Sequence, residues 1–187
     1  MAFNINTFIG NALNFDGYRP NLFRVEMFMP KLFGWDNFSF KAKATSIPGS
    51  DIGVASVFFY GREVKLAGNR EFGPWTVTVY MDENDFGGSG TRGIFESWLY
   101  YINEHIENKR TVGWNSADYA GYFGDGYVYP QSKDGQYDLA LYNMISCYPI
   151  DVGPLQLDWG DDNRVAEFTV TFDYQWWNET FNSTTLG

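Results

Sequence analysis

Three carboxylates near the C-terminal end are the first residues whose type and spacing could carry chemistry. In the stretch PLQLDWGDDNRV, Asp158, Asp161 and Asp162 lie within five positions, beside Trp159. Oxygen ligands at this density could bind Ca²⁺, and one carboxyl group here could be half of a glycosidase acid pair. The spacing does not match an EF-hand loop, however, and two flanking strands already explain a turn. We therefore interpret the cluster as a turn.

A second acidic stretch, DENDFGGSGT at 82–91, offers Asp82, Glu83 and Asp85 as partners for such an acid pair. Nothing in the sequence fixes the separation between two carboxyl groups that glycoside hydrolysis requires. We interpret this stretch as a solvated loop. Its GGSG segment, 87–90, lacks the Lys and Ser/Thr of a P-loop and is interpreted as a flexible hinge.

The chain has one histidine, His105, and one cysteine, Cys147. This count excludes zinc sites built from Cys and His, Cys-His nucleophile pairs and a disulfide within one chain. His105 lies beside the apolar stripe of an expected helix, and no nucleophile elbow accompanies it, so we interpret it as a bordering or partly buried residue. The sequence therefore predicts no catalytic residue, no bound metal and no cofactor.

Size and charge narrow the class of protein. The 187 residues suit one domain, and 13 Lys plus Arg against 23 Asp plus Glu give a net charge of -10, which opposes tight binding to nucleic acid. No apolar run approaches the roughly 18 residues of a membrane helix, and the first residues lack the basic flank of a signal peptide. We expect a soluble protein of intracellular origin without membrane insertion. Its 20% aromatic content suggests partners, because aromatic residues are enriched in interfaces.

Hydrophobic periodicity predicts a chain that is mainly β. Period-two alternation predicts strands at 38–48 and 75–82. Residues 54–68 form either one long strand or a hairpin around Gly61, and residues 137–150, apolar on both faces, form a strand buried on two sides.

One helix is expected, at roughly 92–109, followed by a stretch without regular period. Residues 111–136 repeat Gly and Tyr and are interpreted as a long loop or a set of short extended pieces. The helix is predicted by an apolar stripe at three- and four-residue steps, made of Phe95, Leu99, Ile102 and Ile106.

The chain is expected to close with a β-hairpin that contains the acidic cluster. Its strands are 155–159 and 164–177, with the turn at Asp161, Asp162 and Asn163. In the first strand, Leu155, Leu157 and Trp159 share one face, and Asp158 points to the other.

Five stretches together resemble the tail tube proteins of contractile-tailed bacteriophages, the myoviruses. The resemblance depends on their order and spacing and spans roughly residues 18–177. The stretches are RPNLFRVE (19–26), FKAKATSIPGSDIG (40–53), GREVKLAGNREFGPWTVTVYMDE (61–83), FESW (95–98) and YPIDVGPLQLDWGDDNRVAEFTVTFDYQWW (148–177).

The resemblance implies an antiparallel β-sandwich or small barrel with one flanking α-helix. Such subunits assemble into hexameric rings with a continuous inner β-barrel, and the rings stack into a tube that delivers the phage genome into the host. Residues 1–187 would form a single tail-tube domain, with a core at about 18–177, the loop at about 111–136 and a polar, frayed tail at 178–187. Strand faces rich in Thr and Lys could then line a water-filled lumen.

The same resemblance implies the partners and the location. The partners are other copies of the chain, the tail sheath protein, the tape measure protein, and the baseplate and tail terminator proteins, with DNA passing through the lumen without sequence specificity. The protein would reside in the virion tail after assembly in the cytoplasm of the bacterial host.

Eight positions match the motifs of the family and are expected to determine fold and assembly. Arg62 and Arg70 are expected to make charge-assisted hydrogen bonds to carboxylates within or between subunits, and Gly68 and Gly153 to satisfy turns. The eight are Arg62, Gly68, Arg70, Trp75, Gly153, Leu157, Asp158 and Trp159.

Three alternatives stay open at this point. The chain could be a tube-initiating baseplate protein or the tube protein of a related injection system. It could instead be an aromatic-rich β-sandwich that binds carbohydrate through exposed residues such as Trp114. A hydrolase that uses Asp158 or Asp161 is the third alternative.

Overall fold

The computed structural model describes residues 5, 10, 17–30, 41–88, 90–109, 121–160 and 164–181. None of the helices in these ranges is long and apolar enough to cross a membrane. In chain order the elements are β1 (Phe23–Phe28), β2 (Ala42–Thr45), β3 (Ser50–Phe59), β4 (Arg62–Phe72), β5 (Trp75–Tyr80), η1 (Glu83–Asp85), α3 (Thr91–Ile102), β6 (Gly124–Pro130), β7 (Ala140–Val152), β8 (Glu167–Asp173) and β9 (Trp176–Phe181).

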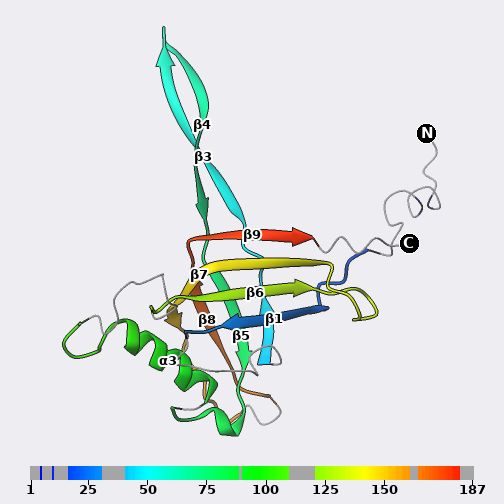
Figure 1. Cartoon of the computed structure of the whole chain (residues 1–187), viewed down its shortest axis with the longest axis vertical. Helices are drawn as coiled ribbons and strands as arrows, with labels where there is room; N and C mark the ends of the chain where they lie inside the picture. The colour runs from blue at the N-terminus through cyan, green and yellow to red at the C-terminus, as the bar shows by residue number, and fades with distance from the viewer. Residues whose placement is uncertain are drawn as a thin grey trace.

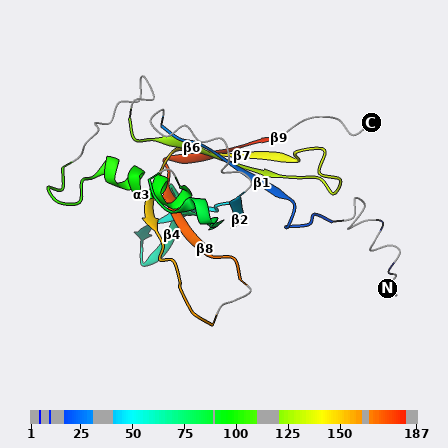
Figure 2. The same ribbon diagram turned by 90° about the horizontal axis from the view of Figure 1, so that it is seen from below.

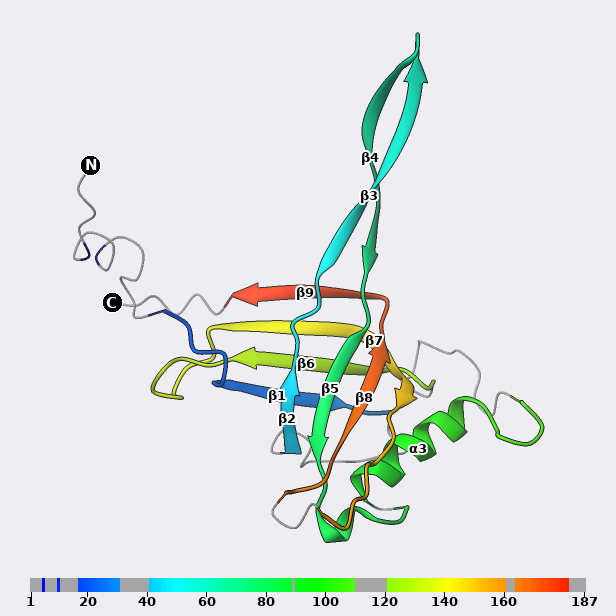
Figure 3. The ribbon, with the colours of Figure 1, turned by 180° about the vertical axis from the view of Figure 1, so that it is seen from behind.

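Strand β7 joins two crossed layers of antiparallel sheet (Figure 3). Its first half pairs with β6 and β9, and its second half pairs with β8. Ser146, at a positive φ of 55°, lies where the strand passes from one layer to the other. One layer, here named the outer layer, consists of β1, β6, β7 and β9, and the other, here named the inner layer, consists of β7, β8, β5 and β2. Seen from below in Figure 2, β8 and β2 lie on one side of β1, β6, β7 and β9. This arrangement confirms the predicted antiparallel sandwich with one flanking helix.

The core lies between the two layers, and α3 closes one end. Trp75, Val77 and Val79 of β5 are fully buried, and their register partners in β8 are Phe172, Val170 and Phe168. Phe95 and Trp98 of α3 reach Phe172 with ring centroids 5.7 and 6.4 Å away. Burial of each such side chain contributes about 1.5–3 kcal/mol, so the alternation that predicts β5 also secures the sandwich.

The opposite face of the inner layer carries four half-buried threonines, here named the threonine face. Thr76 lies opposite Thr171, and Thr78 lies opposite Thr169. The inner layer therefore has one apolar and one hydroxyl-bearing face, as period-two alternation predicts.

Strands β3 and β4 form a separate two-stranded hairpin that projects far from the sandwich (Figure 1). The turn consists of Tyr60 and Gly61, with φ of 47° and 74°, the left-handed pair that tight hairpins favour. Of the two predictions for 54–68, the hairpin around Gly61 is confirmed.

The helix prediction is wrong at its C-terminal end. Asn103 caps α3 directly after Ile102, and Glu104 and Asn108 then close a tight turn through backbone bonds. Ile106, expected in the buried stripe, is 91% exposed. Trp98 fills the buried stripe instead.

Of the two predictions for 111–136, short extended pieces fit where the stretch is described, because β6 lies within it with Gly126 under the Trp75 ring. The prediction of a frayed tail is wrong at its start. Residues 178–181 of the expected frayed tail belong to β9, which pairs with β7. Residues 111–120 and 182–187 lie outside the described ranges.

Candidate assembly surfaces

The projecting hairpin exposes an unusually apolar surface, here named the hairpin surface. None of its side chains is buried, because among the described strands each of the two pairs with no other than its partner in the hairpin. An isolated two-stranded hairpin is marginally stable in water, and large exposed apolar patches indicate interaction sites. The surface is made of Val54, Val57, Phe58, Phe59, Tyr60 and Leu66, which are 51–93% exposed.

No role for these apolar residues was predicted. The run VFFYG at 57–61 could have indicated an exposed apolar surface, since four large apolar residues before a turn leave no polar face.

Both family-motif arginines lie on the hairpin. Arg62 lies beside the turn opposite Phe59, and Arg70 lies near the base opposite Ile52. Neither pairs with a carboxylate among the described residues of this chain. The expected bonds within the subunit are therefore not formed there, and bonds between subunits stay a prediction.

Gly68 and Gly153 serve close approach rather than turns. A Cβ on Gly68 would lie 2.8 Å from the Gly53 carbonyl oxygen, and a Cβ on Gly153 would lie 3.0 Å from the backbone carbonyl oxygen of Thr169. Both glycines lie beside a paired strand, so the prediction of turn geometry is wrong for both. Trp75, another of the eight positions that match the family motifs, is a core residue whose Nε1 donates to Thr45 Oγ1 at 2.8 Å.

The expected strand at 155–159 does not form. The β7–β8 ladder ends where Gly153 N donates to Thr169 O at 2.7 Å. Pro154 follows and has no N–H to extend the ladder. β8 pairs with β5 and β7 instead of with 155–159, so the closing hairpin is wrong in its first strand. The proposed turn at 161–163 lies outside the described residues.

Residues 154–160 form no strand and instead border an open groove of about 830 Å³, here named the connection groove. Leu157 is 81% exposed, and Trp159 is fully exposed, so the two do not share a packed strand face. Asp158 Oδ1 accepts from Gly160 N at 2.8 Å, which is local turn chemistry. Lining residues include Thr78, Leu157, Asp158, Trp159, Arg164 and Val165.

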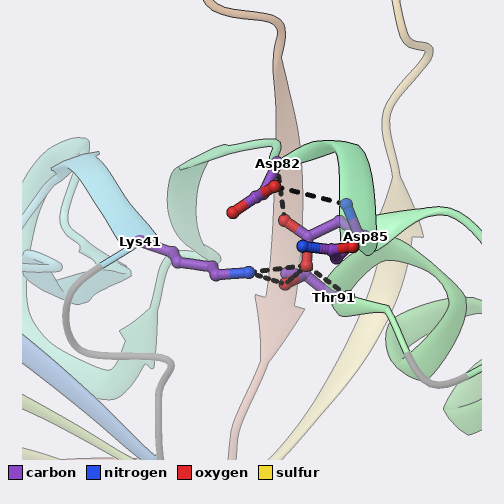
Figure 4. A network of polar contacts seen from close by, with 5 residues as sticks. Lys41, Asp82, Asp85 and Thr91 are labelled. Atoms are coloured by element: carbon purple, nitrogen blue, oxygen red, sulfur yellow. Dashed lines mark hydrogen bonds and ion pairs between the residues drawn. The ribbon is translucent and has the colours of Figure 1, made fainter.

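The second acidic stretch is a structural anchor, and the solvated-loop prediction is wrong for Asp85, which is 3% exposed. Its carboxylate accepts from Lys41 Nζ at 2.6 Å, Thr91 Oγ1 at 2.6 Å and Asp82 N at 2.7 Å (Figure 4). Burial alone raises the pKa of Asp85, but the bonds from Lys41, Thr91 and Asp82 outweigh it and lower the pKa to about 2. The Asp85 side chain is therefore ionised at neutral pH, and it links Lys41, just before β2, to Thr91 at the start of α3.

The predicted GGSG hinge is tightly packed at its end, because a Cβ on Gly90 would lie 1.9 Å from the backbone carbonyl oxygen of Asp85. His105 lies beyond α3, exposed, with its ring 5.4 Å from that of Tyr100, so the bordering position is wrong. Cys147 is fully buried, and burial raises the pKa of its thiol well above the usual range. Across the described ranges, no group of three His, Cys, Asp or Glu side chains could hold a metal.

Comparisons with known proteins identify the family to which this chain belongs. The family model for phage tail tube protein matches residues 18–180. Tail tube protein gp19 of Enterobacteria phage T4 is 31% identical over 162 residues, which cover 87% of this chain and 91% of that protein.

Two cryo-EM structures share the fold. A chain of the six-fold symmetrised anti-feeding prophage (AFP) baseplate aligns with a TM-score of 0.64 and 12% identity, covering 89% of this chain and 97% of that one. A chain of the sheath-tube complex of an extracellular contractile injection system, PVC, aligns with a TM-score of 0.56 and 11% identity, covering 96% and 99%. The chain therefore belongs to the phage tail tube protein family and is a structural protein of the inner tail tube.

Proposed function

We propose that this chain forms hexameric rings that stack into a tube for genome delivery, and that its role is structural rather than catalytic. The hairpin surface carries the proposal. Six large side chains there are at least half exposed, and burying them against another copy removes apolar surface from water, which favours association.

Free strand edges supply the means to close a ring. The inner layer is bounded by β2 on one side and by the second half of β7 on the other, and neither pairs further with a described strand. Unpaired edges invite strand addition, and pairing of one copy's β2 with the next copy's β7 leaves no edge exposed. Repeated around a ring, this pairing makes a continuous inner β-barrel.

In such a barrel the threonine face lines the lumen, because the opposite face is already occupied by the core. Hydroxyl groups carry no charge with which to retain phosphates, and the net charge of -10 repels them. Two cations close to this face, Lys43 and Arg164, are both paired with Glu167. A lumen of this kind lets DNA pass without sequence-specific binding.

The outer layer then faces away from the lumen, where a tail sheath protein would bind. Its exposed side carries Arg24, which stacks 4.2 Å over the Tyr129 ring and pairs with Glu26 at 2.6 Å. Tape measure protein inside the tube, baseplate and tail terminator proteins at its ends, and assembly in the host cytoplasm complete the proposal.

Electron microscopy of the concentrated protein tests this function. We expect rings and tubes from the unchanged chain, loss of tubes in Phe58→Asp, and retention of tubes in Phe86→Asp. Phe86 is the matched control because it is 65% exposed but lies outside the hairpin, where Phe58 is 75% exposed. A protein that stays monomeric at high concentration would contradict the proposal.

A further inference from the structure

The two edge strands of the inner layer run in opposite directions. β2 is antiparallel to β5, β5 to β8, and β8 to the second half of β7, so β2 and β7 of one chain are antiparallel to each other. Figure 3 shows β2 and the end of β7 on opposite sides of β5 and β8. Rotation about a ring axis preserves the direction of each strand along that axis. β2 of one copy therefore meets β7 of the next as an antiparallel pair, like every other pair in this layer.

Each of these two edges carries a charged side chain on the side of the sheet that bears the threonine face. On β7, Asp151 is the register partner of Thr171, and register partners point to the same side of a sheet. On β2, Lys43 pairs with Glu167, and its Nζ lies 5.7 Å from the centre of the Tyr80 ring. Those two partners lie opposite each other and alternate with buried residues as the threonines do. Lys43 and Asp151 of adjacent copies would therefore lie on the same side of the junction.

The carboxylates of this face are unequally supplied with cations. Glu167 accepts from Lys43 and also from Arg164, whose Nη2 lies 3.1 Å from Glu167 Oε1. Asp151 is exposed and forms no ion pair with any residue that the structure describes. The Lys43 side chain is 39% exposed, so its ammonium group is free to turn toward a second acid. Arg164 would then still neutralise Glu167.

We infer that Lys43 of one copy forms an ion pair with Asp151 of its neighbour in the same ring, and that this pair sets the register in which β2 joins β7. The inference rests on the proposed ring function and names the residues that specify the junction. β2 has only four residues, so its backbone bonds define the register weakly. Opposite charges across two strands stabilise one register over the others. The contact is heterologous and repeats at every junction of a closed ring.

Charge reversal tests the pair. We expect Lys43→Asp and Asp151→Lys each to lower the fraction of protein in rings and tubes about tenfold, because like charges then face each other at every junction. The double variant, Lys43→Asp with Asp151→Lys, should restore rings. Lys109→Asp is the matched control, because Lys109 is also an ion-paired surface lysine but lies outside the inner layer and should not alter rings. Electron microscopy and sedimentation count the rings, and urea unfolding checks that each variant is folded.

Cross-linking of the unchanged protein supplies a readout that needs no substitution. A carbodiimide joins an amine to a carboxylate that it contacts, without a spacer. In dissociated subunits Lys43 should be joined to Glu167 of its own chain, whereas in rings it should also be joined to Asp151. In rings mixed from isotope-labelled and unlabelled protein, mass spectrometry should find the Lys43–Asp151 link between a labelled and an unlabelled peptide.

The outcomes separate the pair from the ring function. Normal rings from Lys43→Asp, a folded double variant that stays dissociated, or intact rings without a Lys43–Asp151 link between copies would each overturn the pair and leave the ring function standing. Failure of the unchanged protein to form rings would overturn the ring function and, with it, the pair.

Discussion

Gly68 of β4 lies against Gly53 of β3 at the one point where the hairpin register shifts. A Cβ on Gly68 would meet the Gly53 carbonyl oxygen at 2.8 Å and the carbonyl carbon at 2.9 Å. Bulges of this kind bend and twist a hairpin, and here the close contact involves backbone atoms that no rotamer change can move. The direction in which the hairpin projects therefore depends on two residues without side chains.

Gly68→Ala should loosen the base of the hairpin without unfolding the sandwich. We expect a local cost of about 1–3 kcal/mol, because an added methyl group has no room against backbone. Amide exchange in β3 and β4 should rise at least tenfold while β5 and β8 stay protected, and tubes should be lost. Gly49→Ala is the control, since nothing lies within 4 Å of its added Cβ. Unchanged exchange in β4 of Gly68→Ala would contradict this prediction.

The Asp85 carboxylate should make stability depend on pH in acid. Its folded pKa of about 2 is below the usual 3.8, so its contribution is fully present above pH 3.8 and disappears as the pH falls through about 2. A difference of this size corresponds to about 2 kcal/mol.

Urea unfolding at pH 5 and pH 2 measures this contribution, at protein concentrations too low for assembly. The unchanged chain should lose about 2 kcal/mol more between the two pH values than Asp85→Asn does. Asp51→Asn, at an exposed position in β3, should lose as much as the unchanged chain. Equal losses in all three proteins would show that the buried carboxylate is not the cause.

Sequence patterns predicted the inner layer well, because its alternation is local information. The apolar positions of 75–82 and the apolar residues before Asp173 are those that the core buries. The bounds of β6 could not be predicted within 111–136, because Gly124 and Gly126 occupy its inward positions. The Trp98 and Trp75 rings from α3 and β5 fill the space there, within 3 Å of any added Cβ. That complementarity exists only after folding.

The site shows the same limit. Leu157, Asp158 and Trp159 have the alternation of a strand, but Pro154 ends the ladder and β8 has both its edges filled. Pro154 was the available local signal; the occupation of β8 by β5 and β7 is not local. Asp85 was identified as a candidate, yet only the structure brings Lys41, 44 residues away, to its carboxylate.

Phe172 should be the most sensitive residue of the core. Its ring contacts Trp75 at 5.2 Å as well as Phe95 and Trp98 of α3, so it joins the inner layer to the helix. We expect Phe172→Ala to lower the free energy of unfolding by about 3–5 kcal/mol. Thr171→Ala, one position away on the threonine face, should cost less than about 1 kcal/mol. Similar losses in urea unfolding would contradict the assignment of the two faces.

Thiol accessibility can identify the lumen face. Thr76→Cys places a thiol on the threonine face away from the connection groove, and Asn178→Cys places one on the exposed side of β9 in the outer layer. Both should react with a small maleimide in tubes. Only Asn178→Cys should react with a maleimide carried by a protein wider than the lumen. The pKa of the Cys147 thiol is raised and its side chain is buried, so the unchanged protein gives a low background.

Dissociated subunits are the control for this experiment, because there both thiols should react with both reagents. If Thr76→Cys in tubes reacted with the protein-linked maleimide as fast as Asn178→Cys, the threonine face would lie outside. The outer layer would then line the lumen, because it is the other face of the sandwich that the core leaves uncovered. The assignment of the threonine face to the lumen would be wrong.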